Sequence, residues 1–127
     1  MLKFFVLDNQ AVARNLLSSI LLQGGHQVLG DSNISVVNLA RIAKLQPQVL
    51  CVDLGDFNKE ALTLLDSLRE QLPKALVFVV AARIDADFIT QCQEHGVNGF
   101  IVKPFNAAAV LSAIRNTIIR LAKQPRT

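Results

Sequence analysis

Val49-Leu50-Cys51-Val52-Asp53 is the stretch of this chain that decides its fold, since four apolar residues in a row end on an aspartate. A short apolar run without alternation is typical of a strand buried on both faces, as in a parallel sheet. Pro47 comes just before the run, where a helix has to end. Four further runs are predicted as strands: Leu2–Leu7, Gln27–Leu29, Leu76–Ala81 and Phe100–Val102.

The segments between these runs have apolar residues three and four positions apart, which is the spacing of amphipathic helices. The apolar faces expected from this spacing are Leu16, Leu17, Ile20 and Leu21; Val36, Val37, Ala40 and Ala43; Leu62, Leu65 and Leu68; Phe88, Ile89 and Cys92; and Val110, Ile114, Ile118 and Leu121. Asn106 is expected to cap the last helix. Five strands alternating with five helices predict a doubly wound (βα)5 α/β domain with a parallel sheet covered on both faces.

Composition narrows the class of protein further. The chain has 127 residues, of which 51% are hydrophobic and 18% charged, so it is too apolar for a disordered chain and has the length of one domain. No apolar run approaches the 18 residues or so that a membrane span needs. Cys51 and Cys92 lie far apart in apolar segments, which argues against a disulfide scaffold or a zinc site. We therefore expect a cytoplasmic protein that makes no membrane contact.

Positive charge gathers at the C-terminal end. Residues 95–127 contain five Lys or Arg and no acid, whereas residues 1–94 contain eight Lys or Arg and ten acids. No aromatic residues are interleaved with these charges as base stacking would require. We expect a solvated basic helix near the end of the chain and no direct DNA binding.

Charged residues, one of them with an amide neighbour, follow three of the predicted strands. Asp8 and Asn9 follow the first, Asp53 the third, and Lys103-Pro104 the fifth. In an open parallel sheet the functional crevice lies at the carboxyl ends of the strands, so these groups are expected to meet. Converging carboxylates repel each other unless a cation intervenes, and Mg²⁺ prefers oxygen ligands. A metal-bound carboxylate beside a lysine is a site prepared for a phosphoryl group.

Other site chemistries have no motif in this chain. It lacks G-x-G-x-x-G after the first strand, G-x-x-x-x-G-K-[ST], and the G-x-S-x-G of serine hydrolases. A small-molecule binder on the same fold therefore has little support, and we expect no enzyme in the ordinary sense. His26 and His95 are expected to be exposed at the opposite end of the sheet.

The sequence resembles a response-regulator receiver domain, the phospho-accepting module of two-component signalling. The resemblance rests on Asp53 at the end of its strand and on Gly99-Phe100-Ile101-Val102-Lys103-Pro104-Phe105. It implies a flavodoxin-like sheet of order 2-1-3-4-5, a phosphoacceptor at Asp53, phosphoryl stabilisation by Lys103, and a cis peptide between Lys103 and Pro104. It also implies Mg²⁺ on Asp8, Asn9, Asp53 and the Gly55 carbonyl, with switch positions at Ala81 and Phe100.

The chain departs from the family pattern at several of these positions. Asn9 stands where a second acidic residue is usual, so Mg²⁺ is expected to bind weakly. Ala81 replaces the usual Ser or Thr, whose hydroxyl would bond the phosphoryl group and link it to Phe100. Asp56-Phe57 replaces the usual Met-Pro, and Ala61 replaces the usual Gly. We therefore expect phosphorylation to move Phe100 only a little.

Two functional readings follow from the resemblance. In the first, a receiver domain over residues 1–123, with a short tail at 124–127, accepts a phosphoryl group on Asp53 from a histidine kinase or phosphotransfer protein. It then signals to a downstream protein target by protein–protein contacts. In the second, a pseudo-receiver acts as an interaction module without phosphorylation. A homodimer through helix 4, strand 5 and helix 5 is a further expectation.

Overall fold

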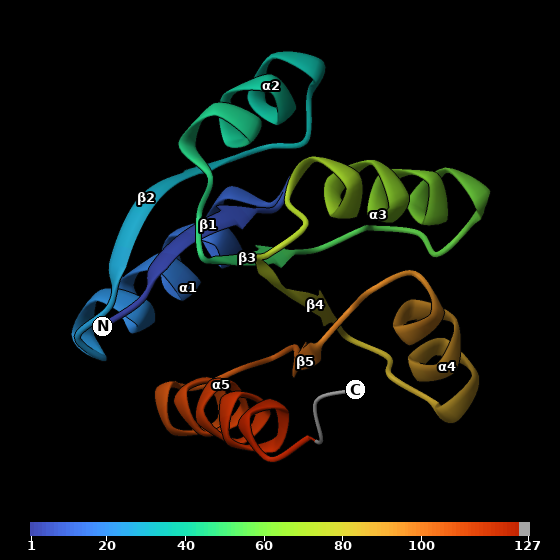
Figure 1. Cartoon of the computed structure of the whole chain (residues 1–127). Helices are drawn as coiled ribbons and strands as arrows, with labels where there is room; N and C mark the ends of the chain where they lie inside the picture. Colours follow the sequence, from blue (N-terminus) through green and yellow to red (C-terminus); the bar gives the residue numbers. More distant parts are fainter. Residues whose placement is uncertain (125–127) are drawn as a thin grey trace.

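A computed structural model describes residues 1–124 and confirms the predicted doubly wound α/β fold (Figure 1). The elements are β1 (Lys3–Leu7), α1 (Ala11–Gln23), β2 (Gln27–Ser32), α2 (Val36–Leu45), β3 (Val49–Val52), α3 (Lys59–Gln71), β4 (Leu76–Ala81), α4 (Ala86–Glu94), β5 (Gly99–Val102) and α5 (Ala107–Ala122). The predicted tail at 124–127 lies outside the described residues, except for Gln124.

The five strands are parallel and form one sheet of order β2-β1-β3-β4-β5, as the family resemblance implied. Figure 1 shows α1 and α5 on one face of this sheet and α2, α3 and α4 on the other. β1 and β3 lie in the interior of the sheet, side by side, so the residues that follow them share one edge.

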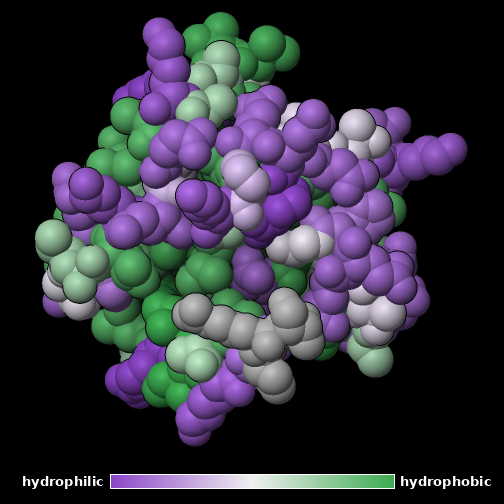
Figure 2. All heavy atoms as spheres, viewed as in Figure 1, coloured by the Kyte–Doolittle hydropathy of each residue, from purple (hydrophilic) through white to green (hydrophobic). Residues whose placement is uncertain are grey.

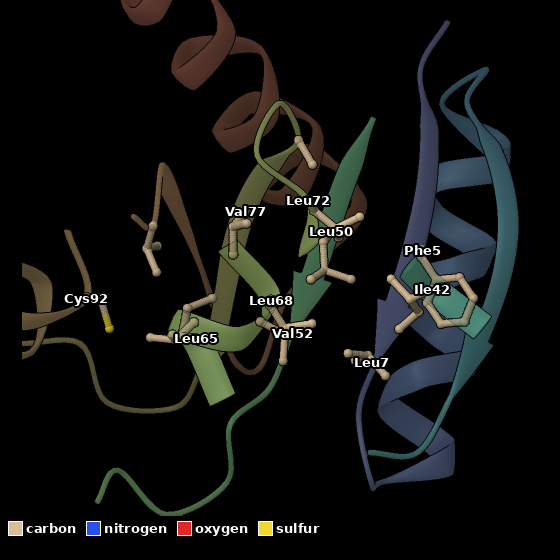
Figure 3. Close-up of a cluster of buried hydrophobic side chains, with 13 residues drawn as sticks. Phe5, Leu7, Ile42, Leu50, Val52, Leu65, Leu68, Leu72, Val77 and Cys92 are labelled. Carbon is tan, nitrogen blue, oxygen red and sulfur yellow. The ribbon is translucent and has the colours of Figure 1, made fainter. Parts of the chain in front are cut away.

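The hydrophobic core is split by the sheet into two clusters. Because successive side chains of a strand point to opposite faces, Phe5 of β1 packs with α2, α3 and α4, whereas Phe4 packs with α1 and α5. Figure 3 shows the first cluster, in which Leu50 and Val52 of β3 face Leu65 and Leu68 of α3. In both clusters strand side chains pack against helix side chains, so the core positions β1, β3 and β5, whose ends carry the charged residues.

Side-chain caps begin four of the five helices. Asn106 caps α5 as predicted, since its Oδ1 accepts the Ala109 N–H at 2.9 Å. Ser35, Asn58 and Asp85 cap α2, α3 and α4 in the same way. Such caps satisfy amide groups that a helix start leaves without a partner.

Two predictions about the β2–α2 region were wrong. The second helix does not bury Val36 and Val37, which are 84% and 77% exposed, but packs through Ile42 and Leu39. Figure 2 shows hydrophobic side chains at the surface over α2. β2 also runs three residues further than predicted, to Ser32, because Asp31 and Ser32 still pair with Val6 and Leu7 of β1. The Asp31 side chain pairs with Arg14 of α1 at 3.2 Å.

The predicted exposure of three other residues was also wrong. Leu16 was expected on the buried face of the first helix, but it is 48% exposed. Both histidines were expected to be exposed, and both are half-buried. His26 accepts the Leu2 N–H at 3.2 Å and packs on Phe4, and burial lowers its pKa. His95 ends α4 and pairs with Asp66 of α3 at 2.6 Å.

The two cysteine thiols are buried and free of disulfide bonds. Burial raises the pKa of Cys51 to about 12 and that of Cys92 to about 11, so both stay protonated at neutral pH. Among residues 1–124, no helix has the length and apolar character to cross a membrane.

Candidate functional site

One ammonium group joins two carboxylates at the carboxyl edge of the sheet. Lys103 Nζ lies 2.6 Å from Asp53 Oδ2 and 2.9 Å from Asp8 Oδ2, and it also donates to Gln10 Oε1 at 3.0 Å. The side chains of Asp8, Lys103 and Asp53 are only 7%, 15% and 17% exposed. The structure thus brings together three predicted site residues that lie 45 or more positions apart in the sequence.

The remaining carboxylate oxygens accept backbone hydrogen bonds. Asp8 Oδ1 accepts the Gln10 N–H at 2.8 Å, and Asp53 Oδ1 accepts the Gly55 N–H at 2.8 Å. Gly55 has a φ of +70°, which suits glycine and lets the chain turn back to the carboxylate. Each of the four carboxylate oxygens therefore has one partner, and both side chains are held in place.

The two carboxylates set the charge state of Lys103. Burial alone would lower the pKa of its ammonium, but hydrogen bonds and charge attraction from Asp53 and Asp8 outweigh burial and raise the pKa above its ordinary value of 10.5. Lys103 is therefore a fixed positive charge at neutral pH, placed where an incoming anion would meet Asp53.

Asn9 is placed differently from the other predicted metal ligands. Its Oδ1 accepts the Ile34 N–H at 2.8 Å and so holds the β2–α2 loop. Residues 1–124 contain no cluster of three or more His, Cys, Asp or Glu side chains that could hold a metal ion. Two carboxylates and nearby carbonyl oxygens still make a donor set of the kind Mg²⁺ takes, with a smaller charge than three carboxylates would give.

The remaining predicted residues lie around this centre. Ala81 ends β4, and its carbonyl accepts the backbone N–H of Lys103 at 2.9 Å. Phe100 of β5 is half-buried against the cluster shared with α3 and α4. The Lys103–Pro104 peptide is cis, as the family resemblance implied.

Sequence reasoning missed two groups that support the site. Gln10 contributes its side-chain oxygen to Lys103, and Arg14 Nη1 donates to the Asp8 carbonyl at 2.8 Å. The only signal for them was their position, since Gln10 lies two residues after Asp8 and Arg14 lies in the first turn of α1. An open, mostly apolar groove of about 720 Å³ lies beside them, lined by Gln10, Ala11, Val12, Ala13, Leu16, Ala82, Lys103, Pro104 and Phe105.

Comparison with known proteins shows a family and a relative of similar length. Residues 4–115 match the response regulator receiver domain family. The chemotaxis protein CheY of Bacillus subtilis is 22% identical over 116 residues, which are 91% of this chain and 97% of CheY.

Solved structures share the same fold. A response regulator from Thermotoga maritima has a TM-score of 0.81 and 23% identity, covering 94% of this chain and 98% of that one. A response regulator protein from Burkholderia pseudomallei, solved with a phosphorylated aspartic acid, a calcium ion and citrate, has a TM-score of 0.76 and 23% identity, covering 97% of this chain and 72% of that one. With the family match spanning most of the sequence, this chain belongs to the response regulator receiver domain family.

Proposed function

We propose that this chain is a working receiver that accepts a phosphoryl group on Asp53. The observation that carries the proposal is the single ammonium of Lys103, which lies 2.6 Å from Asp53 and 2.9 Å from Asp8 in a mostly buried site. In such a transfer, a carboxylate oxygen of Asp53 bonds to phosphorus while the bond from phosphorus to the donor breaks and its electron pair stays with the donor. Lys103 would then leave the carboxylate oxygen and pair with the phosphoryl oxygens.

The residues of this edge would also hold Mg²⁺. Asp8, Asp53 and the Gly55 carbonyl supply the oxygen ligands, and Asn9 joins them only if its oxygen releases the Ile34 N–H. A bound Mg²⁺ would neutralise part of the charge on the phosphoryl oxygens. Arg14 keeps Asp8 in position through the Asp8 carbonyl, so this carboxylate is ready for either cation.

The proposed donor is a histidine kinase or a phosphotransfer protein. Whatever protein delivers the phosphoryl group has to reach Asp53, and the groove beside Lys103 offers it an apolar contact surface. Val12, which is 83% exposed, and Leu16 line that groove. The burial of such side chains by a partner would be favourable.

Labelling with a small phosphodonor tests the function. Incubation with acetyl phosphate and Mg²⁺ should add one phosphoryl group, detected by mass spectrometry of the intact protein. Asp53→Asn should abolish the added mass, because an amide is not a nucleophile of this kind, whereas Asp56→Asn, at an exposed carboxylate three residues away, should leave it unchanged.

Absence of labelling at every Mg²⁺ concentration would favour the second candidate, an interaction module that works without phosphorylation. The lack of a hydroxyl at Ala81 and the engaged oxygen of Asn9 are the observations in favour of that module.

Restoring a third carboxylate should tighten the metal site. Asn9→Asp adds a unit of negative charge and keeps an oxygen that can accept the Ile34 N–H. We expect Mg²⁺ affinity to rise about tenfold, which corresponds to about 1.4 kcal/mol of extra charge attraction. Titration calorimetry of the two proteins measures this, with Asn33→Asp as a control for a carboxylate added outside the site. Equal affinities of wild type and Asn9→Asp would contradict a metal site at this position.

The surface of α4, β5 and α5 is proposed to contact a downstream protein or a second copy of the chain. Val102 of β5 and Ile119 of α5 are 55% and 45% exposed, and Arg115 and Arg120 are exposed near Ile119. Sedimentation at several concentrations should show a dimer that Ile119→Lys weakens, because a charge at an apolar contact costs desolvation energy. A strictly monomeric protein at high concentration would leave only the downstream partner for this surface.

A further inference from the structure

Three aromatic rings connect the loop that carries the acceptor to the switch position on β5. Phe57 lies four residues after Asp53, Phe88 in the first turn of α4, and Phe100 in β5. The Phe57 and Phe88 rings meet edge to face, with centroids 4.6 Å apart and planes at 62°. The Phe88 and Phe100 rings are tilted by 57°, with centroids 6.0 Å apart. We call these three residues the aromatic stack.

The aromatic stack packs against the hydrophobic core. All three rings are half-buried and pack against the cluster formed with α3 and α4, part of which Figure 3 shows. Phe88 is fixed at its base, because its N–H bonds the capping carboxylate of Asp85 at 2.9 Å. Phe88 therefore holds one ring on each side, and neither can leave its position without losing an aromatic contact.

The β4–α4 loop lies apart from the acceptor loop, in contrast to Lys103 after β5, which pairs with Asp53 at 2.6 Å. Ala81 has no hydroxyl to bond a phosphoryl oxygen. An open groove of about 420 Å³ separates the β4–α4 loop at Ala82 and Arg83 from the acceptor loop at Gly55 and Asp56. Contact across this gap is made by Phe57 and Phe88, which also line the groove.

We propose that Phe57 is a positioning residue that, through Phe88, holds Phe100 in one packed position whether or not Asp53 is modified. A receiver built in this way presents a preset α4–β5 surface, and site occupancy changes the charge of the site more than the position of Phe100. This inference concerns the regulation of the proposed phosphoacceptor site, and in that respect it rests on the proposed function. The packing of Phe100 by Phe57 holds independently of phosphorylation.

Fluorine NMR of protein containing 3-fluorophenylalanine tests the proposal directly. The chain has seven phenylalanines, and the Phe100 resonance is identified by its loss in Phe100→Leu. The wild type should give one narrow Phe100 resonance. Phe57→Leu should shift or broaden it without any ligand, because loss of an aromatic pair lowers the population of the packed position about two- to tenfold. Phe57→Tyr keeps the aromatic ring, so the Phe100 resonance of this variant should match that of the wild type.

A control variant and a ligand separate the possible outcomes. Phe105→Leu removes an aromatic ring that packs on the opposite face of the sheet, and it should leave the Phe100 resonance unchanged. In the wild type, beryllofluoride with Mg²⁺ should shift the resonance of the Gly55 amide, measured by nitrogen-15 NMR. The same ligand should move the fluorine resonance of Phe100 less in the wild type than in Ala81→Thr. An unaltered Phe100 resonance in Phe57→Leu, or a full displacement by beryllofluoride in the wild type, would overturn the proposal. If the Gly55 amide does not respond while Phe57→Leu still shifts Phe100, the phosphoacceptor function fails and the positioning role of Phe57 stands.

Discussion

Replacing Arg69 by alanine is expected to lower the free energy of unfolding by about 3 kcal/mol or more. The guanidinium of Arg69 in α3 donates to the Leu72 and Ala75 carbonyls at 3.0 and 2.8 Å. It also reaches the segment between α4 and β5, where it donates to the Gly96 carbonyl at 3.0 Å and to Asn98 Oδ1 at 3.2 Å. Alanine would leave these half-buried acceptors without a donor, and each such loss costs about 1 kcal/mol or more. Urea denaturation followed by circular dichroism measures the change.

The controls for Arg69 separate the hydrogen-bond network from charge. Arg69→Lys keeps the positive charge but cannot bond two separate segments at once, so it should lose most of the same stability. Arg41→Ala removes an exposed arginine of α2 and should change stability by less than about 0.5 kcal/mol. A loss below about 1 kcal/mol in Arg69→Ala would show that water replaces the guanidinium at these carbonyls.

Gly96 is part of the same network. Its φ is +90°, and a Cβ atom there would lie 2.8 Å from Arg69 Nε. Glycine is therefore needed both for the backbone conformation and for the close approach of the guanidinium. The sequence suggested only that Gly96 could stop a helix, because a contact with an arginine 27 positions earlier leaves no local pattern.

The sequence predicted best those features that depend on burial along a strand. β3 and β4 have the predicted bounds, because strands covered on both faces need continuous apolar residues. β2 is an edge strand with a polar end at Asp31, which pairs with Arg14. A prediction from apolar residues alone therefore ended this strand at Leu29, three residues too early. The buried face of α2 was predicted at Val36 and Val37, but the same helix carries a second apolar pair, Leu39 and Ile42, and spacing alone does not say which pair packs on the core.

In the candidate site, too, some features could be predicted from the sequence and others could not. The meeting of Asp8, Asp53 and Lys103 follows from strand order, because parallel strands place their carboxyl ends at one edge. The orientation of Asn9 depends on a loop amide at Ile34, and the role of Gln10 depends on the reach of its side chain to Lys103. Neither is encoded in spacing. Loop hydrogen bonds of this kind depend on the path of the folded backbone, which residue spacing does not determine.

Removing the ammonium of Lys103 should destabilise the fold by about 3 kcal/mol at neutral pH. Lys103→Met keeps the apolar stem but leaves Asp8 and Asp53 facing each other without a counter-ion, and the Asp8 side chain is only 7% exposed. Mg²⁺ should restore part of this loss, because both carboxylates gain a free oxygen when the lysine is gone. We therefore expect added Mg²⁺ to raise the melting temperature of Lys103→Met by more than that of the wild type, measured by thermal denaturation.

The pH dependence of the same difference identifies its cause. The pKa of Lys103 is raised above its ordinary value of 10.5 by Asp53 and Asp8 despite the opposing effect of burial. A raised pKa means that the lysine contributes its full stabilisation below pH 10.5 and loses it as the pH rises through the folded-state pKa. The stability gap between wild type and Lys103→Met should therefore be constant near neutral pH and narrow only in strongly alkaline solution. Lys103→Arg keeps a cation and should retain most of the stability. If Lys103→Met matched the wild type in stability at neutral pH and gained nothing from Mg²⁺, Asp8 and Asp53 would not depend on the Lys103 ammonium as their counter-ion, even though it lies 2.6 Å from Asp53 and 2.9 Å from Asp8.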